Sequence, residues 1–145
     1  MGIAIVYVTT SNYISQDYEL ITLIHNSLLE VKSINFGEKI TTKWDRLLIV
    51  RPYSNLRQIF EYYDLSWRPI KTNIEILDWY SLLIFLYKNE VVTFINYPRN
   101  KGDFSCYSNF KGENRILLSR DNTRFVYEAM ANFEACIRHY PNDNL

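Results

Sequence analysis

The sequence predicts a single α+β domain, in which a mixed sheet of three to five strands packs with about four helices. Apolar residues occur both in short continuous runs, which are typical of buried strands, and at the spacing of amphipathic helices. The composition is that of a folded protein, with 48% hydrophobic and 22% charged residues but only 4 Gly and 4 Pro. No linker, repeat or low-complexity tract divides residues 1–145, and this length is typical of one domain.

In the first half of the chain, predicted strands alternate with predicted helices. Residues 3–8 form a β-branched run, which is the pattern of a strand buried on both faces. Ser15 fits the N-cap of a helix that runs to about residue 32. Residues 46–50 form a second short apolar run that ends before a Pro, and residues 54–68 carry the apolar face of a second helix. The residues at helical spacing in the first helix are Tyr18, Ile21, Ile24, Leu28 and Val31.

A strong helix signal lies in the middle of the chain. Thr72 and Glu75 fit a capping box, in which the Thr hydroxyl accepts from the third helical amide and the Glu side chain reaches back to the cap. The pattern predicts a buried helix over residues 73–88. Its apolar window, from Trp79 to Tyr87, is shorter than the roughly 20 residues that a membrane-spanning helix needs, so we expect no membrane segment.

The last third of the chain predicts two strands and one helix. Residues 91–97 and 115–119 are short apolar runs, and residues 98–114 between them form a polar loop. Asp121 or Asn122 caps a predicted final helix that extends to about residue 138.

Charge and motif content argue against several functional classes. The 16 basic residues cancel the 16 acidic ones, so the whole chain has no basic field that would attract nucleic acid. The sequence contains no phosphate-binding glycine loop, HExxH, calcium loop or GxSxG pattern, and we expect no cofactor and no metal. The N-terminus lacks a basic region before its apolar run, which predicts a cytoplasmic protein without a signal peptide.

Histidines and cysteines are the candidates for catalysis. His25 lies in the middle of a predicted helix and His139 in the last turn of another, positions that are typical of structural or surface histidines. Cys106 in the polar loop is more accessible than Cys136, which has the helical spacing of a core residue. Two cysteines favour a reducing compartment and a fold that is indifferent to reductant, although a single bridge between them stays open.

The chain is rich in aromatic residues, with 12 Tyr, 8 Phe and 3 Trp. Tyr and Trp combine a large apolar area with a polar tip, so those outside the core are suited to interfaces. The densest segment is residues 60–68, where Tyr62 and Trp67 are predicted anchors beside the charged Asp64 and Arg68. Trp67 fits a core residue under the turn equally well.

A second aromatic segment lies in the polar loop. Phe104 and Tyr107 are predicted to form a second edge of the same protein-binding surface. Bases such as Arg99, Lys101 and Lys111 alternate with these aromatics, a pattern that can also bind single-stranded nucleic acid by stacking. Because the chain as a whole is neutral, we do not expect nucleic-acid binding.

In its single-domain size, its lack of a signal or cofactor motif and its aromatic and charged segment at residues 60–68, the chain resembles the small cytoplasmic immunity proteins that bacteria carry against polymorphic or contact-dependent toxins. Many accessory proteins of phages and mobile elements share these features. The resemblance implies a non-catalytic module that neutralises a cognate toxin by tight binding. The alternatives are a small accessory enzyme that uses His25, His139 or Cys106, and a nucleic-acid-associated protein.

Overall fold

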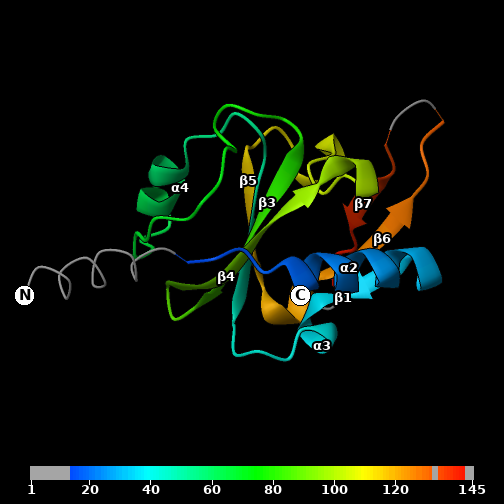
Figure 1. The fold of residues 1–145 in the computed structure, drawn as a ribbon, viewed down its shortest axis with the longest axis horizontal. Coiled ribbons are helices and arrows are strands. Elements are labelled where there is room, and N and C mark those ends of the chain that lie inside the picture. The colour runs from blue at the N-terminus through cyan, green and yellow to red at the C-terminus, as the bar shows by residue number, and fades with distance from the viewer. Residues whose placement is uncertain (1–13, 132–133, 143–145) are drawn as a thin grey trace, which may run out of the picture.

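The computed structural model describes residues 14–131 and 134–142 (Figure 1). Its helices are α2 (Tyr18–Val31), α3 (Phe36–Lys39) and α4 (Leu56–Tyr62), and its 3-10 helices are η1 (Arg99–Lys101), η2 (Tyr107–Asn109) and η3 (Arg120–Asn122). Its strands are β1 (Ser33–Asn35), β2 (Arg46–Val50), β3 (Tyr80–Tyr87), β4 (Glu90–Pro98), β5 (Arg115–Ser119), β6 (Arg124–Glu128) and β7 (Cys136–His139). The strand predicted at residues 3–8 lies outside the described residues.

The strands form two antiparallel sheets (Figure 1). The order is β4-β3-β2-β5 in the four-stranded sheet and β1-β6-β7 in the three-stranded sheet. The fold class is therefore α+β, as the sequence predicts. None of the helices in the described part of the chain combines the length and the apolar character that a membrane crossing needs.

Each face of the four-stranded sheet is covered by a separate apolar cluster. In β2, Leu47 and Ile49 belong to the cluster that contains α2 and the three-stranded sheet. Leu48 and Val50 belong to the cluster under α4. Successive side chains of a strand point to opposite faces, so a strand between two clusters is apolar at every position. This is why the short run at residues 46–50 predicts its strand correctly.

Helix α2 confirms the first predicted helix, with a different cap. Asp17, and not Ser15, is the N-cap, because its Oδ1 accepts from the N–H of Leu20 at 3.1 Å. Tyr18 and Val31 stand at the two ends of the helix and are exposed, although the helical spacing assigns them to the buried face. The residues that α2 buries are Leu20, Ile24 and Leu28.

The predicted buried helix over residues 73–88 is wrong, because residues 80–87 form β3. This strand pairs with β2 on one side and with β4 on the other, and residues 82–86 are completely buried. A strand that is covered on both faces has the same continuous apolar sequence as a buried helix, so periodicity does not separate the two.

The predicted capping box forms a single turn. Thr72 Oγ1 accepts from the N–H of Ile74 at 3.2 Å, which is a local hydroxyl turn. The carboxylate of Glu75 accepts from the N–H of Leu56 at 3.0 Å, and so it caps α4 instead of its own segment. Glu75 therefore does act as a cap, as the sequence predicts, but the helix that it caps is α4.

The predicted final helix is also wrong, because β6 and β7 form an antiparallel pair in its place. Phe125 pairs with His139, and Glu128 pairs with Cys136. β6 also pairs with β1, which is distant in the sequence. These pairings bury Phe125 and Ile137 completely, and they outweigh the helical spacing of the apolar residues.

Candidate functional site

Helix α4 lies on the face of the four-stranded sheet opposite to α2. Asn55 is its N-cap, because its Oδ1 accepts from the N–H of Gln58 at 3.1 Å. Ser54, where the sequence begins the helix, donates its hydroxyl to the carbonyl of Arg51 at 2.7 Å. The residues that α4 buries against the sheet are Leu56, Ile59 and Phe60.

A tight turn follows α4 and carries the predicted binding residue Asp64. The N–H of Leu65 donates to the Phe60 carbonyl at 2.9 Å, and the N–H of Ser66 donates to the Asn89 carbonyl at 2.9 Å. Asp64 has a φ of 58°, in the left-handed region that Asp tolerates better than most residues. Asp64 therefore shapes the turn, while its side chain is exposed.

Trp67 contacts the core and the solvent at the same time. Its ring centroid lies 5.2 Å from that of buried Phe60 in an edge-to-face contact, and the Arg57 guanidinium carbon lies 4.5 Å from the Trp67 ring centroid. The residue is 39% exposed. The two alternatives predicted for Trp67 are thus combined: part of the ring covers Phe60, and the rest faces outward under Arg57.

Tyr62 is paired with an arginine in the same way. It is 70% exposed, packs edge-to-face on Tyr63 at 4.9 Å and lies 4.4 Å from the guanidinium carbon of Arg115. Arg115 begins β5, so this contact joins the end of α4 to the sheet edge. The α4 surface is defined here as the exposed residues Arg57, Tyr62, Asp64, Trp67 and Arg68 together with the partly buried Arg115.

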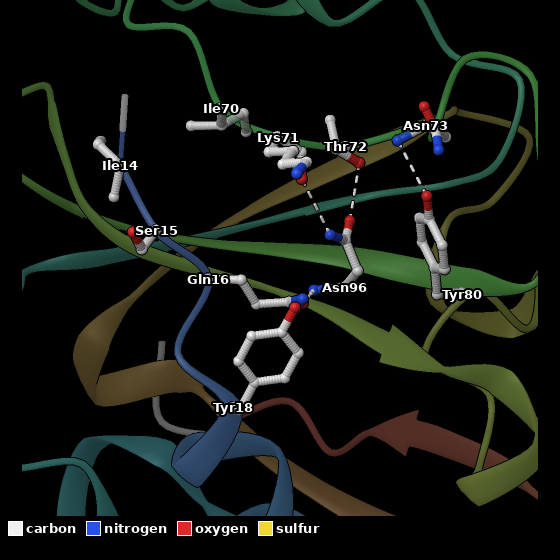
Figure 2. Close-up of a pocket in the computed structure, with 10 residues that line it drawn as sticks. All are labelled: Ile14, Ser15, Gln16, Tyr18, Ile70, Lys71, Thr72, Asn73, Tyr80 and Asn96. Atoms are coloured by element: carbon white, nitrogen blue, oxygen red, sulfur yellow. Dashed lines mark hydrogen bonds between the residues drawn. The ribbon is translucent and has the colours of Figure 1, made fainter. Parts of the chain in front are cut away.

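A pocket of about 840 Å³ opens beside the outer edge of β4 (Figure 2). Its lining comes from residues 14–16, from Tyr18, from residues 70–73, and from Tyr80 and Asn96 in the four-stranded sheet. These segments are distant in the sequence and contain no recognisable motif, so sequence reasoning missed the pocket.

The two residues predicted in the polar loop behave differently. Phe104 is completely buried among aromatic rings, with its centroid 5.1 Å from Tyr97 and 5.3 Å from Phe125, so its prediction as a contact residue is wrong. Tyr107 is 71% exposed in η2, which packs on β7. Phe104 belongs to the cluster on the sheet face opposite α4, so it is not part of a surface around Tyr62, and the role of Tyr107 stays a prediction.

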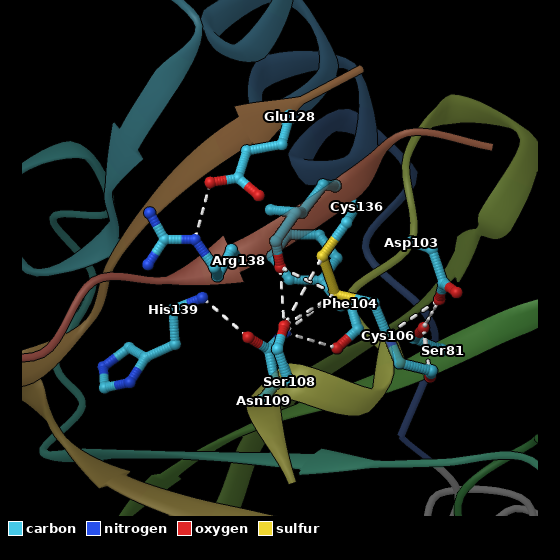
Figure 3. The surroundings of a disulfide bond; sticks show 12 residues. Ser81, Asp103, Phe104, Cys106, Ser108, Asn109, Glu128, Cys136, Arg138 and His139 are labelled. Carbon is cyan, nitrogen blue, oxygen red and sulfur yellow. Dashed lines mark hydrogen bonds and ion pairs between the residues drawn. A yellow bond between two sulfur atoms is a disulfide. The ribbon is translucent and has the colours of Figure 1, made fainter. Parts of the chain in front are cut away.

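Cys106 and Cys136 form a disulfide between the polar loop and β7 (Figure 3). The sequence predicts a fold that is indifferent to reductant, because two cysteines alone are an unlikely bridge. The structure differs, since the fold brings the Cα atoms of Cys106 and Cys136 to 5.7 Å from one another. Distant pairing of this kind carries no spacing signal. A bonded Cys106 cannot serve as the nucleophile of the enzyme alternative.

The loop is fastened to β7 by hydrogen bonds as well (Figure 3). Asn109 Nδ2 donates to the carbonyl of Ile137 at 2.9 Å, and Asn109 Oδ1 accepts from the N–H of His139 at 2.7 Å. The N–H of Ile137 donates to the carbonyl of Asp103 at 2.9 Å. Asn109 is buried, and no sequence pattern singles it out.

Both histidines lie where burial lowers the pKa of the ring, and His139 also contacts a backbone carbonyl. Burial lowers the pKa of His25, as does the nearby charge of Lys101, and its buried Nδ1 has no hydrogen-bond partner among the described residues. Burial likewise lowers the pKa of His139, whose Nε2 lies 2.9 Å from the carbonyl oxygen of Asn122. A carbonyl only accepts, so Nε2 carries the hydrogen. The contact of His139 fits a structural histidine, one of the roles that the sequence suggests.

Among the described residues, no three His, Cys, Asp or Glu side chains gather in a way that could hold a metal ion. No protein-family model, curated protein or solved structure matches this chain.

Proposed function

We propose that this chain is a protein-binding module and that the α4 surface is its binding site. The observation that carries the proposal is the pairing of exposed aromatic rings with arginines, Tyr62 with Arg115 and Trp67 with Arg57. Tyr, Trp and Arg are the residue types most enriched at interface hot spots. A ring that already packs against an arginine loses less side-chain freedom on binding, which lowers the entropic cost of association.

The charge on this surface is mixed and predominantly positive. Its basic members are Arg57, Arg68 and Arg115, of which Arg115 forms an ion pair with Glu113 at 2.9 Å, and its acidic member is Asp64. Charges around an aromatic centre set orientation and select among partners more than they add affinity. This arrangement supports recognition of a partner that presents acidic side chains around an apolar centre.

The partner that we propose is a toxin domain, which the chain would neutralise by covering part of its surface. The support is the resemblance to immunity proteins, which rests on size, missing cofactor motifs and the segment at residues 60–68. Neutralisation by occlusion needs no catalytic group on the inhibitor. The described geometry of His25, His139 and Cys106 is consistent with such a role.

The compartment is a separate part of the proposal. The sequence predicts a cytoplasmic protein, whereas disulfides persist mainly in oxidising compartments. Maleimide labelling of intact source cells after rapid acid quenching distinguishes the two. Labelled Cys106 and Cys136 would support the cytoplasm, and unlabelled cysteines would move the proposal to an oxidising compartment.

The binding proposal is tested with two matched tyrosines. Tyr140 also packs against arginines, with the Arg124 guanidinium carbon at 5.0 Å from its ring, but it follows β7 and lies outside the α4 surface. With a partner captured by the wild-type chain, we expect Tyr62→Ala to weaken binding by about 2 kcal/mol, roughly 30-fold in Kd. Tyr140→Ala should leave the Kd unchanged.

Calorimetric titration measures both affinities, and thermal melts confirm that both variants are folded. A folded Tyr62→Ala variant with wild-type affinity would place the binding site elsewhere. An equal loss in both variants would show that the α4 surface has no special role.

A further inference from the structure

We propose that the pocket beside β4 binds the oxyanion group of a small organic molecule, a carboxylate or a phosphate ester. The proposal is independent of the protein-binding function, because the pocket shares no residue with the α4 surface. Its volume of about 840 Å³ lies within the range of small-molecule sites. Figure 2 shows the polar side chains that converge on it from the sheet, from the segment before α2 and from residues 70–73.

Hydrogen bonds within the wall occupy acceptor atoms of the pocket. Gln16 Oε1 accepts from the N–H of Asn96, and Asn96 Oδ1 accepts from the hydroxyl of Thr72 at 2.7 Å. The Tyr80 hydroxyl oxygen accepts from the N–H of Asn73 at 2.9 Å. These bonds fix the orientation of both amide groups, since each amide oxygen must face its donor.

Donor groups remain for a ligand. With its oxygen turned to Asn96, the Gln16 amide keeps both hydrogens on Nε2. The hydroxyl hydrogen of Tyr80 is not used by the bond from Asn73, because that bond uses an oxygen lone pair. Two other donors are used within the wall, because the Thr72 hydroxyl donates to Asn96 Oδ1 and Asn96 Nδ2 donates to the Lys71 carbonyl at 3.2 Å. The donors that remain on Gln16 and Tyr80 suit a ligand rich in acceptors.

The charge of the wall favours the same kind of ligand as its free hydrogen-bond donors. Lys71 alone carries a formal charge among the described residues that line the pocket, and none of them is Asp or Glu. A Lys ammonium provides three further donors and attracts an anion. The ligand group that satisfies both features is an oxyanion.

The apolar part of the wall specifies an organic ligand. Ile14 and Ile70 form a parallel bridge at one side of the pocket, and the exposed ring of Tyr18 stands at another. An aromatic ring or short alkyl group could pack there while its oxyanion faces Gln16 and Lys71. Hydrated inorganic phosphate would not use these contacts.

The test compares benzoate, phenyl phosphate and benzamide, which share a ring and differ in the attached group. The readout is the displacement of the side-chain amide signals of Gln16 and Asn96 in ¹H–¹⁵N spectra of the full chain. We expect at least one of the two anions to bind at least tenfold more tightly than neutral benzamide. The tighter of the two identifies the source as a carboxylate or a phosphate ester.

Three variants assign the effect to the pocket. Gln16→Glu keeps an oxygen for the N–H of Asn96 but replaces the donor with a negative charge, and Lys71→Gln removes the positive charge; each should weaken anion binding at least tenfold. Lys88→Gln, at the opposite end of β3, is the matched control and should bind like the wild type. Thermal melts confirm that each variant is folded. Equal binding of benzamide and both anions, or wild-type affinity in both pocket variants, would overturn the proposal.

Discussion

At the residue scale, the side chain of Arg120 donates to more backbone carbonyls than that of any other described arginine. Its guanidinium donates to the carbonyls of Gly37, Ile40, Thr42 and Trp44, at distances from 3.0 to 3.3 Å. It also lies 4.8 Å from the Trp44 ring centroid. One planar cation therefore connects the carbonyls of the irregular chain between α3 and β2.

We expect Arg120→Ala to lower the free energy of unfolding by about 3 kcal/mol, because several carbonyls lose a charged donor. Arg120→Lys should recover only part of this loss, since an ammonium group cannot reproduce the planar fork. Urea denaturation measures the effect, and Arg124→Ala, at an exposed position, serves as the control. Wild-type stability in Arg120→Lys would show that charge alone is sufficient.

His139 gives the fold a dependence on pH. Burial lowers its pKa in the folded state below the ordinary value of about 6.5, so the unfolded chain binds the proton more readily. Stability is therefore fully present above about pH 6.5 and falls as the pH decreases through the window below it. His25, whose pKa is also lowered by burial, acts in the same direction.

We expect His139→Gln to lose less stability than the wild type between pH 7.5 and pH 5.5. The measurement is urea denaturation at several pH values within this interval, which lies above the titration of ordinary carboxylates. The comparison uses the slope with pH and not the absolute stability, which the substitution also changes. Identical slopes in the two proteins would contradict the assignment.

At the scale of elements, the sequence correctly predicts the strands that stand out as short apolar runs. The run at residues 46–50 and that at residues 115–119 match β2 and β5 residue by residue, and residues 91–97 lie within β4. The segments predicted at 73–88 and 121–138 fail for a different reason. Their conformation depends on strands that pair with them from distant parts of the chain, and such pairing leaves no local pattern.

The residues of the candidate site also divide into those that the sequence could reveal and those that it could not. Exposed Tyr62 and half-exposed Trp67 could be found because they lie in one continuous segment that is dense in aromatic and charged residues. Their arginine partners could not, because Arg115 comes from β5 and no spacing rule connects it with α4. The pocket at Gln16 and Asn96 could not be found either, since its wall assembles only when the sheet forms.

At the scale of the whole molecule, the disulfide between Cys106 and Cys136 restricts the conformations of the unfolded chain more than those of the folded chain. The two cysteines are 30 residues apart, and a bridge across a loop of this length contributes about 3 to 4 kcal/mol by restricting the unfolded state. In the folded state the loop is also held by Asn109 and Asp103, so the reduced protein should keep its fold.

We therefore expect reductant to lower the melting temperature clearly while the far-UV circular dichroism of the reduced protein below its melting temperature stays native. The double variant Cys106→Ser, Cys136→Ser should melt at the temperature of the reduced wild type and show no further response to reductant. A melting temperature that does not change with reductant would show that the bridge does not contribute to stability.

Asn109 also affects whether two molecules can associate through the edges of their sheets. An outer strand of a sheet exposes alternating donors and acceptors to which a strand of a neighbouring molecule can add. On β7 that row is occupied: Asn109 offers one acceptor and one donor in the order that a pairing strand would, and Asp103 supplies the next acceptor. The Asn109 side chain and the Asp103 carbonyl together close this edge to strand addition, so that chains crowded together have no template here from which a fibre could grow.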